Sequence, residues 1–575
     1  MTTVKALGRA CLFGQAGLKS ARERGWAMRA WCLALVVVMC GWSASRAWAQ
    51  MSVLSVTPSM NANNVSRTTQ VRATFNRAID TAVFDGSRVS VFGKSTGPVA
   101  GAVTFANNNR TLVVTPTRPF FAGEVVVVML PGGIRAADGS LLRAAGFSWT
   151  FTVGAAPSFH RFEQVDSLSN RDETGAVTRI YGGLACDLNR DGRLDITTIN
   201  QDSGDARVFL HTGVYEHPYG AMLSPYPQIP LSSSPNDVAD FNRDGFIDMM
   251  TASDSENKFA VLMGNGDGTF QAGVEVASGW YARGIVSLDV DGDADADIAV
   301  AHYISGTLAI LINDGTGHFG SQTDIDIPGG PWALAAAEMT NDGVMDLVVG
   351  VAGTQQVAVY RGNGNGTFTP VSSRPSGGHT WVVQCGDLNN DGNMDVTCAN
   401  STSANGSVLL GNGNGTLQAA ATLVTGGNTV STDVADLDGD GDLDWVLSSF
   451  GAGVWYLYLN DGHGVFTPTE EFDAPRNPSC ALPLDFDNDG DIDLALTDEL
   501  ADEVILLRNQ CVSIDFNNDG LLPDTEDIAE LLTVFSGGPC STGGCGSIDI
   551  NNDGLLPDTE DIAVFLRVFS GGACL

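Results

Sequence analysis

One nine-residue string, D-x-[DN]-x-D-G-x-x-D, recurs seven times between residues 187 and 493 and constrains the fold more than any other feature. Successive copies start 53 residues apart once and 49 residues apart five times. Short apolar and β-branched runs, separated by Gly and Asn turns, flank each copy. Four such runs in each period predict a four-stranded sheet, and seven periods predict a closed seven-bladed β-propeller. The copies, named acidic loops 1 to 7, begin at Asp187, Asp240, Asp289, Glu338, Asp387, Asp436 and Asp485.

Each acidic loop has the composition of a site for a hard cation. Side-chain oxygens at positions 1, 3, 5 and 9 and the backbone carbonyl at position 7 can converge on one centre, while Gly at position 6 permits a sharp turn. Oxygen-only ligands on a flexible loop favour Ca²⁺ over softer metals. The alternative is a turn that Asx hydrogen bonds hold without metal. Loop 4 departs from the string at Glu338 and Thr340, and loop 3 has Ala294 in place of Gly.

With one ion in each loop, the seven acidic loops would bind at most seven calcium ions. The predicted ligands are Asp187, Asn189, Asp191, Arg193 and Asp195; Asp240, Asn242, Asp244, Phe246 and Asp248; Asp289, Asp291, Asp293, Asp295 and Asp297; Glu338, Thr340, Asp342, Val344 and Asp346; Asp387, Asn389, Asp391, Asn393 and Asp395; Asp436, Asp438, Asp440, Asp442 and Asp444; and Asp485, Asp487, Asp489, Asp491 and Asp493.

Residues 157–509 resemble the FG-GAP/VCBS repeats of integrin-α-like propellers, on the basis of these loops and their flanking runs. The resemblance implies a calcium-binding β-propeller. The last copy lacks an outer strand, and the upstream stretch Ser158–Val165 resembles the outer strand at Val465–Phe472. We therefore expect the upstream stretch to complete the seventh blade, which removes an exposed sheet edge.

The charge of the chain excludes two classes of partner. There are 67 acidic and 30 basic residues, which give a formal net charge of −37 and a pI near 4.2. Nucleic-acid binding needs a basic face, and an anionic membrane surface repels an acidic chain. We therefore expect neither partner.

Residues 1–49 have the pattern of a secretory signal. Three Arg residues between positions 22 and 29 precede the apolar run 30–42, and a small-x-small cleavage site ends at Ala49. Cleavage after Ala49 predicts an extracellular or cell-surface protein without a remaining transmembrane segment. The alternative is an N-terminal anchor that is not cleaved.

Residues 50–154 form a separate predicted unit. Runs such as 71–75 and 147–153 read as strands, and about seven strands in roughly 100 residues is the size of a β-sandwich. The strings at 73–80 and 115–121 resemble bacterial Ig-like domains of surface-layer and adhesin proteins. The resemblance implies a structural spacer.

Residues 511–575 contain a tandem repeat. The loop at 515–527 returns 34 residues later, and apolar residues at helical spacing follow each copy. The tandem resembles a dockerin, a paired calcium loop–helix module, which implies two further Ca²⁺ ions and a cohesin partner. Asp524 and Thr525 replace the usual hydroxyl pair at the positions that recognise cohesin. The alternative partner is therefore another surface receptor. The ligands expected here are Asp515, Asn517, Asp519, Leu521, Glu526, Asp527, Asp549, Asn551, Asp553, Leu555, Glu560 and Asp561.

The cysteine positions predict disulfide bridges, which persist in the oxidising environment of an exported protein. Two pairs with equal separation bracket the two C-terminal loops, a third pair flanks acidic loop 5, and a fourth lies in the first and seventh repeats. The predicted bridges are Cys511–Cys540 and Cys545–Cys574, and the further candidate pairs are Cys385–Cys398 and Cys186–Cys480.

The predicted function is non-enzymatic. The sequence has no H-E-x-x-H string, and carboxylates committed to metal are weak evidence for acid–base catalysis. We therefore predict an exported calcium-binding adhesion protein that uses the propeller to bind a protein or glycan and the dockerin-like module for attachment. The alternative is a secreted polysaccharide lyase or hydrolase with its active site on the propeller face opposite the acidic loops.

Aromatic residues mark that opposite face. The segments that enter the first strand of repeats three to five carry most of them, which suits stacking on sugar rings or a protein contact. The alternative is that Trp332 and Trp381 pack between blades. The candidate ligand-face residues are Trp280, Tyr281, Arg283, His302, Tyr303, Trp332, His379 and Trp381.

Overall fold

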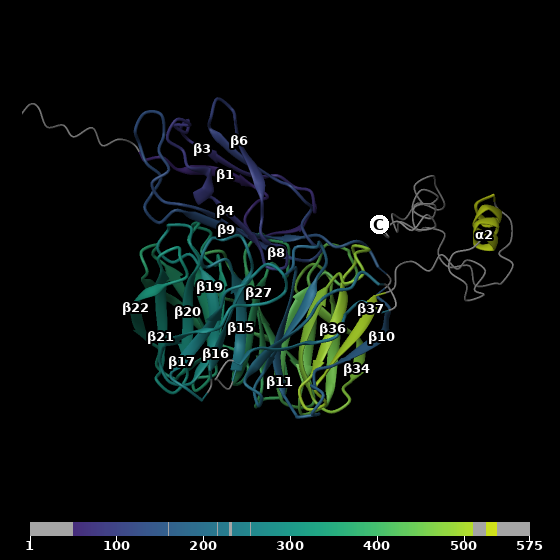
Figure 1. Cartoon of the computed structure of the whole chain (residues 1–575). Helices are drawn as coiled ribbons and strands as arrows, with labels where there is room; N and C mark the ends of the chain where they lie inside the picture. Colours follow the sequence, from purple (N-terminus) through teal and green to yellow (C-terminus); the bar gives the residue numbers. More distant parts are fainter. Residues whose placement is uncertain are drawn as a thin grey trace, which may run out of the picture. The chain divides into compact units, whose positions relative to one another are not determined.

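The computed structural model describes residues 50–158, 160–214, 217–228, 233–253, 255–509 and 525–536. The predicted signal segment and most of the predicted C-terminal module lie outside the described residues. Strands dominate the described part of the chain (Figure 1). Within it, no helix combines the length and the apolar character needed to cross a bilayer.

The N-terminal unit is a β-sandwich, as the sequence predicts. Its elements are β1 (Val53–Thr57), β2 (Ala62–Val65), β3 (Val71–Phe75), the 3-10 helix η1 (Gly86–Arg88), β4 (Ser90–Gly93), β5 (Gly97–Pro98), β6 (Gly101–Ala106), β7 (Thr111–Pro116), β8 (Val125–Leu130) and β9 (Phe147–Val153). One sheet has the order β1-β3-β7-β6 and the other β2-β9-β8-β4-β5. Alternate residues of β3, such as Phe75, are buried and share one core with Trp149 and Phe151 of the other sheet.

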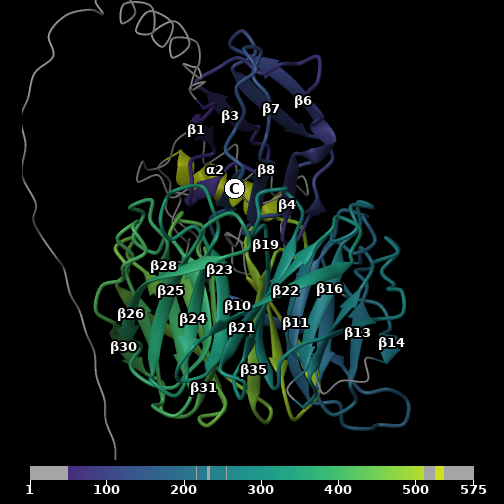
Figure 2. The ribbon, with the colours of Figure 1, turned by 90° about the vertical axis from the view of Figure 1, so that its left-hand side faces the viewer.

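The acidic-loop region forms seven four-stranded antiparallel sheets. Its strands are β10 (Phe162–Ser169), β11 (Ile180–Cys186), β12 (Asp195–Asn200), β13 (Asp205–Phe209), β14 (Leu223–Gln228), β15 (Ser233–Ala239), β16 (Asp248–Ser253), β17 (Lys258–Leu262), β18 (Val274–Ala277), β19 (Ala282–Leu288), β20 (Asp297–His302), β21 (Thr307–Asn313), β22 (Phe319–Asp326), β23 (Pro331–Ala337), β24 (Asp346–Val351), β25 (Gln356–Gly362), β26 (Phe368–Pro375), β27 (Thr380–Gly386), β28 (Asp395–Asn400), β29 (Asn405–Leu409), β30 (Ala421–Val424), β31 (Thr429–Ala435), β32 (Asp444–Ser449), β33 (Val454–Asn460), β34 (Phe466–Asp473), β35 (Pro478–Leu484), β36 (Asp493–Asp498) and β37 (Glu503–Asn509). Sheets 1 to 6 each take four consecutive strands from β11 onward, and sheet 7 contains β35, β36, β37 and β10. Figure 2 shows the strands of sheet 4, β23 to β26, side by side.

Neighbouring sheets share hydrophobic cores in cyclic order. The first strand of each sheet contacts the first strand of the next, and β35 of sheet 7 contacts β11 of sheet 1. Each pair of neighbouring sheets encloses one core, including the pair of sheets 7 and 1, whose core contains Phe486 and Phe209. The second strands are buried on both faces, which is why 347–351 reads as a continuous apolar run instead of an alternating one.

The last sheet is completed by a strand from upstream of the first. β10 pairs antiparallel with β37, from Phe162 opposite Asn509 to Ser169 opposite Glu503. This pairing confirms the expectation from the stretch 158–165, although the strand begins four residues later than that stretch. Leu168 of β10 is buried in the core between sheets 7 and 1. The outer edge of β37 is therefore covered by β10.

One α-helix is described in the C-terminal region. Helix α2 (Thr525–Phe535) coincides with the helix expected after the first C-terminal loop, and Leu531 is its buried side chain among those described. Glu526 and Asp527 belong to this helix, while the other predicted ligands of the module and its four cysteines lie outside the described residues.

The two candidate disulfides of the repeat region do not form, since Cys186, Cys385, Cys398 and Cys480 are free thiols. Cys385 lies opposite Val396 and Cys398 lies opposite Val383, so the two cysteines are diagonal neighbours on adjacent strands. Diagonal pairs are typically too far apart for an S–S bond. Cys186 faces the core between sheets 1 and 2, whereas Cys480 packs on the core between sheets 7 and 1. These two thiols therefore belong to different interfaces.

Candidate functional site

The acidic loops join the first and second strands of each sheet and share one set of hydrogen bonds. The closing acid at position 9 is the first residue of the second strand. Its Oδ2 accepts the backbone N–H of position 2 at 2.8–3.1 Å in all seven loops. Its Oδ1 accepts an N–H from the end of the third strand at 2.6–2.9 Å. The closing acid thus fixes the loop to its own sheet.

The position-5 acids make a second hydrogen bond that all seven loops share. The position-5 carboxylate accepts the N–H of position 7 at 2.8–3.0 Å in every loop. In loops 3, 6 and 7, the acids at positions 1, 3 and 9 offer ligand atoms that all lie within 4.8 Å of one another. These are the three loops in which all five predicted ligand positions, including position 7, carry an acidic residue. Three carboxylates at this separation can share one cation.

Buried oxygen atoms without a hydrogen-bond partner indicate where a cation would sit. In the described part of the chain, Oδ1 of the first acid is buried and unpartnered in loops 1, 2, 6 and 7, that is, on Asp187, Asp240, Asp436 and Asp485. A buried polar atom of this kind is costly unless a ligand satisfies it. These residues therefore fit an oxygen-binding metal ion.

Loops 4 and 5 are satisfied internally. In loop 4, both carboxylate oxygens of Glu338 accept backbone N–H groups, from Thr340 at 3.2 Å and from Gly343. In loop 5, Asp387 accepts the N–H groups of Asp391 and Gly392 at 3.0 and 2.7 Å. In loop 3, Asp289 likewise accepts the N–H groups of Gly292 and Ala294 at 2.7 and 3.0 Å. Loops 4 and 5, which also lack a carboxylate cluster among the described residues, match the alternative of a turn held without metal. Loop 3 keeps its turn despite the missing glycine, since Ala294 adopts the left-handed φ of 67°.

The crowded carboxylates have raised pKa values. Burial and the neighbouring acids raise the pKa of the closing acids of loops 3 and 6, Asp297 and Asp444, to about 9. Burial and adjacent aspartates raise the pKa of Asp289 and Asp436 to about 7. Without a cation, these groups retain protons that a bound divalent ion would displace.

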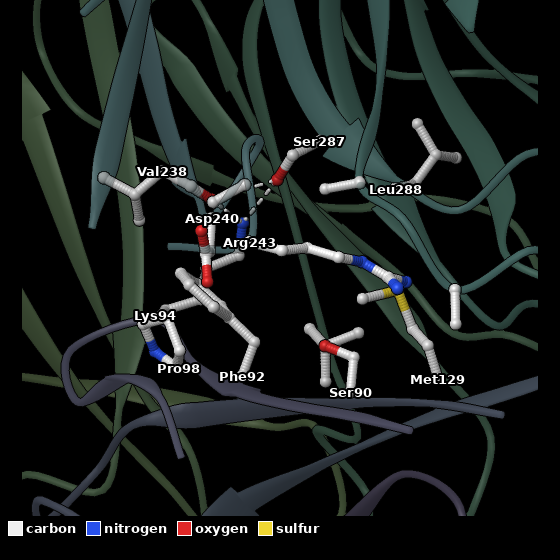
Figure 3. Close-up of a pocket in the computed structure, with 14 residues that line it drawn as sticks. Ser90, Phe92, Lys94, Pro98, Met129, Val238, Asp240, Arg243, Ser287 and Leu288 are labelled. Atoms are coloured by element: carbon white, nitrogen blue, oxygen red, sulfur yellow. Dashed lines mark hydrogen bonds between the residues drawn. The ribbon is translucent and has the colours of Figure 1, made fainter. Parts of the chain in front are cut away.

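The Ig-like domain contacts the acidic-loop end of the sheets. Arg118 Nη1 lies 2.6 Å from Asp187 Oδ2, and Asn63 Nδ2 donates to the carbonyl of Asp387 at 2.6 Å. A small cavity of about 60 Å³ remains at this junction, lined by Phe92 and Lys94 on one side and by residues such as Ser287 on the other (Figure 3). It has room for about two water molecules.

A different feature marks the opposite end of the first strands. In every sheet the pairing register between the first and second strands shifts near the start of the first strand. In five sheets the shift inserts a single residue, six positions before the first acid of the loop. Such β-bulges re-aim a side chain, often next to a functional site. The inserted residues are Tyr181, Arg283, Trp332, Trp381 and Val430.

These bulge residues line one cavity. Its volume is about 100 Å³, and residues from sheets 1, 3, 4, 5, 6 and 7 surround it. The volume is that of about three water molecules, enough for one small group of a larger ligand. The lining residues are Tyr181, Arg283, Trp332, Trp381, Val382, Val430, Ser431, Ser479, Cys480 and Glu499. We call this cavity the bulge pocket.

An aromatic cluster forms one wall of the bulge pocket. The ring centroids of Trp332 and Trp381 are 4.4 Å apart, and Tyr303 and His379 lie 4.8 and 5.1 Å from Trp332. The guanidinium of Arg283 lies 4.7 Å from the centroid of Trp332. Most of the predicted ligand-face residues are thus brought together, although they come from three sheets.

The structure separates the ligand-face candidates by exposure. Trp332 is 7% exposed, as the packing alternative requires, whereas Trp381 is half-buried and Trp280 is 53% exposed. Tyr281, another half-buried residue, adopts a left-handed φ of 66° at a position where the next repeat has Gly330 at φ 76°. Strained residues of this kind cluster at functional sites.

His302 is not a ligand-face residue, contrary to the prediction. Its side chain is 1% exposed, its Nε2 accepts the N–H of Gly279 at 3.0 Å, and it lies 2.5 Å from Ser278 Oγ. Burial lowers its pKa to about 4. The sequence analysis missed Tyr181, Val430, Ser431, Ser479, Cys480 and Glu499. Counting six residues back from each acidic loop would have found three of these, Tyr181, Val430 and Ser479.

Glu499 is the carboxylate of the bulge pocket. It is 5% exposed, and its Oε1 accepts a hydrogen bond from Arg179 Nε at 2.6 Å. Burial raises its pKa, against the opposing effect of Arg179. The pairing with Arg179 occupies one oxygen of the Glu499 carboxylate.

Comparisons with known proteins match both parts of the chain. Residues 49–153 match the bacterial Ig-like domain family. Residues 240–300, 289–349, 340–398, 387–447 and 436–496 match the FG-GAP-like repeat. The chain therefore contains a bacterial Ig-like domain and five FG-GAP-like repeats, which fit a ligand-binding or adhesion-type extracellular protein. No curated protein matches the chain significantly.

Several solved structures resemble the chain weakly. The crystal structure of BBS1N in complex with ARL6DN has a TM-score of 0.44 at 10% identity and covers 61% of this chain and 98% of its own. A lectin of Agrocybe aegerita, described for recognition of non-reducing terminal N-acetylglucosamine, has a TM-score of 0.39 at 20% identity and covers 67% and 94%. A functionally unknown protein from Desulfotomaculum acetoxidans has a TM-score of 0.36 at 10% identity and covers 55% and 91%. At these scores the likenesses carry no argument about function.

Proposed function

We propose that the chain is an exported, calcium-stabilised and non-enzymatic protein that binds a protein or glycan ligand on a β-propeller. The cyclic order of shared cores and the pairing of β10 with β37 support a closed propeller with seven blades. Residues 1–49 would direct export and be cleaved after Ala49. Residues 511–575 would attach the protein through a dockerin-like module with two Ca²⁺ ions and two disulfides, to a cohesin or another surface receptor.

Calcium is the cation that we propose for the acidic loops. The ligand set is made of oxygen atoms alone, which favours Ca²⁺ over softer metals. The clustered carboxylates support binding in loops 3, 6 and 7, and the buried unpartnered oxygens support it in loops 1 and 2. When bound, the ion would neutralise the crowded carboxylates and hold each loop in its turn.

The bulge pocket is the ligand site that we propose. The observation that carries this proposal is the repeated register shift, which aims residues of different sheets into one cavity instead of into the cores between sheets. Aromatic rings with part of their surface exposed, beside hydroxyl groups, suit the apolar faces and hydroxyls of a sugar or an aromatic-rich protein contact. The contacts of the Ig-like domain are at the other end of the sheets.

Two experiments identify the ligand and the class of function. A glycan array and a surface-protein array, probed with the calcium-loaded chain, should give a hit that Trp381→Ala abolishes while the thermal melt stays within a few degrees. Loss of binding only together with a collapsed melt would show that Trp381 is a packing residue. An assay for new unsaturated sugar ends on acidic polysaccharides should stay negative, and a positive result would establish the lyase alternative.

The attachment proposal is tested separately. A pull-down of cohesin domains with the full chain should fail after truncation at residue 510. Capture by the truncated chain would place attachment elsewhere.

A further inference from the structure

The Ig-like domain and the junction of sheets 7 and 1 share a set of specific contacts. We call this junction the seam, because there the upstream strand β10 joins the last sheet. Phe121 of the Ig-like domain is 5% exposed and belongs to the hydrophobic core between sheets 7 and 1. The backbone N–H of Asp187, the first acid of loop 1, donates to the carbonyl of Ser95 at 2.9 Å.

A buried acid, Glu124, organises the Ig-like segments that reach the seam. Its Oε2 accepts the N–H groups of Ser95 and Thr96 at 3.1 and 2.8 Å, and its Oε1 accepts the N–H of Phe121 at 2.8 Å. Segments 95–96 and 121–124 are therefore held together by one side chain that is 4% exposed. A satisfied buried network of this kind fixes geometry.

Two arginines extend from the Ig-like domain to first-position acids on both sides of the seam. Arg118 Nη1 lies 2.6 Å from Asp187 Oδ2 of loop 1, and Arg118 Nη2 donates to the Thr96 carbonyl at 3.1 Å. Arg67 Nη1 lies 3.5 Å from Asp485 Oδ2 of loop 7, and Arg67 Nε donates to the Phe120 carbonyl at 3.0 Å. Both carboxylates are completely buried, whereas each arginine side chain is 34% exposed.

In both acids the atom that the arginine contacts is Oδ2, and the buried Oδ1 has no hydrogen-bond partner among the described residues. A metal ion and the arginine could therefore occupy the same carboxylate at the same time. They would not do so independently. Both are cations within a few ångströms of each other, so each reduces the electrostatic gain of the other.

We propose that Arg118, with Arg67 as the weaker partner, supplies an internal positive charge to the first acids of loops 1 and 7 and keeps the seam closed when those loops lack calcium. The proposal rests on calcium binding by the acidic loops. Each cation then reduces the stabilisation that the other provides, so that Arg118 matters most in the metal-free protein. The Ig-like domain is accordingly a seam-stabilising element and not only a spacer.

The test measures the thermal stability of the chain with Arg118→Ala, in excess calcium and in EDTA. The substitution should lower Tm by at least about 3 °C more in EDTA than in calcium, since the ion can replace the lost charge. Arg110→Ala, at an exposed arginine of the same domain, is the matched control and should give equal small shifts in both buffers. Equal losses for Arg118→Ala in the two buffers, or a larger loss in calcium, would overturn the proposal.

Hydrogen exchange locates the effect. In EDTA, Arg118→Ala should lose protection in β11 and β12 of sheet 1 and in β37 and β10 of sheet 7 before the other sheets, whereas uniform loss or loss confined to the Ig-like domain would contradict a role at the seam. Failure of the underlying calcium proposal is distinguishable, because the unaltered chain would then have the same Tm in calcium and in EDTA.

Discussion

Removal of calcium should destabilise the repeat sheets, and loop 6 gives the size of the effect. Asp436, Asp438 and Asp444 offer ligand atoms within 4.8 Å of one another, a separation at which two unit charges repel by roughly 3.5 kcal/mol at an effective dielectric constant near 20. The metal-free loop relieves this repulsion by holding protons. For that reason burial and its neighbours raise the pKa of Asp444 to about 9.

The free calcium concentration relative to the Kd determines how much calcium binding stabilises the folded chain. At a free calcium concentration 100 times the Kd, each site contributes about 2.7 kcal/mol. Loops 3, 6 and 7 would together contribute about 8 kcal/mol, which corresponds to a Tm increase on the order of 10–15 °C for a domain of this size.

Differential scanning calorimetry in calcium and in EDTA measures this difference. Asp438→Asn should remove about one site's share of the calcium-dependent increase, because an amide is a weaker ligand than a carboxylate. Asp461→Asn, at an exposed acid outside the loops, is the control and should leave the increase intact. A Tm that agrees within about 1 °C in calcium and EDTA would refute the reasoning.

Two further predictions concern pH and packing. In EDTA the folded chain holds more protons than the unfolded chain between the ordinary Asp pKa near 4 and the raised value of about 9, so Tm should fall as pH rises through this window, and calcium should flatten the profile. A Tm that rose with pH in EDTA would show that the loop acids are ionised in the folded state. Trp332→Ala, at a ring that is 7% exposed, should cost about 3–5 kcal/mol in chemical denaturation, and a loss below about 1 kcal/mol would indicate that the ring does not pack in the folded chain.

The fold was largely predictable because its determinants are local and repeated. The acidic-loop spacing indicates the length of each repeat, and continuous apolar runs such as 347–351 indicate strands buried on both faces. Even the pairing of β10 with β37 followed from the likeness between two short segments. The clustering of carboxylates in loops 3, 6 and 7 was predictable for the same reason, since positions 1 to 9 of one loop fold as a unit.

The rest depended on features that sequence spacing does not contain. A one-residue register shift decides that Trp381 faces the bulge pocket, and the same kind of detail places Cys186 and Cys480 at different interfaces. The contact between Arg118 and Asp187 joins residues 69 positions apart in different domains. His302 is buried, and its ring is hydrogen-bonded to the turn that precedes β19. Counting aromatic residues on one face of the sequence pattern does not reveal these hydrogen bonds.

The most direct test of the ligand site fills the bulge pocket without emptying a core. Ser479→Tyr places an aromatic ring at the position where sheet 1 carries Tyr181, so the bulge should accept it, while the ring takes up the roughly 100 Å³ of the pocket. Thr467→Tyr, at an exposed position of the outer strand β34, is the matched control. Calorimetric titration with the ligand found on the arrays should show binding lost in Ser479→Tyr and retained in Thr467→Tyr, with the calcium-dependent Tm unchanged in both. Undiminished binding by Ser479→Tyr would show that the ligand binds elsewhere.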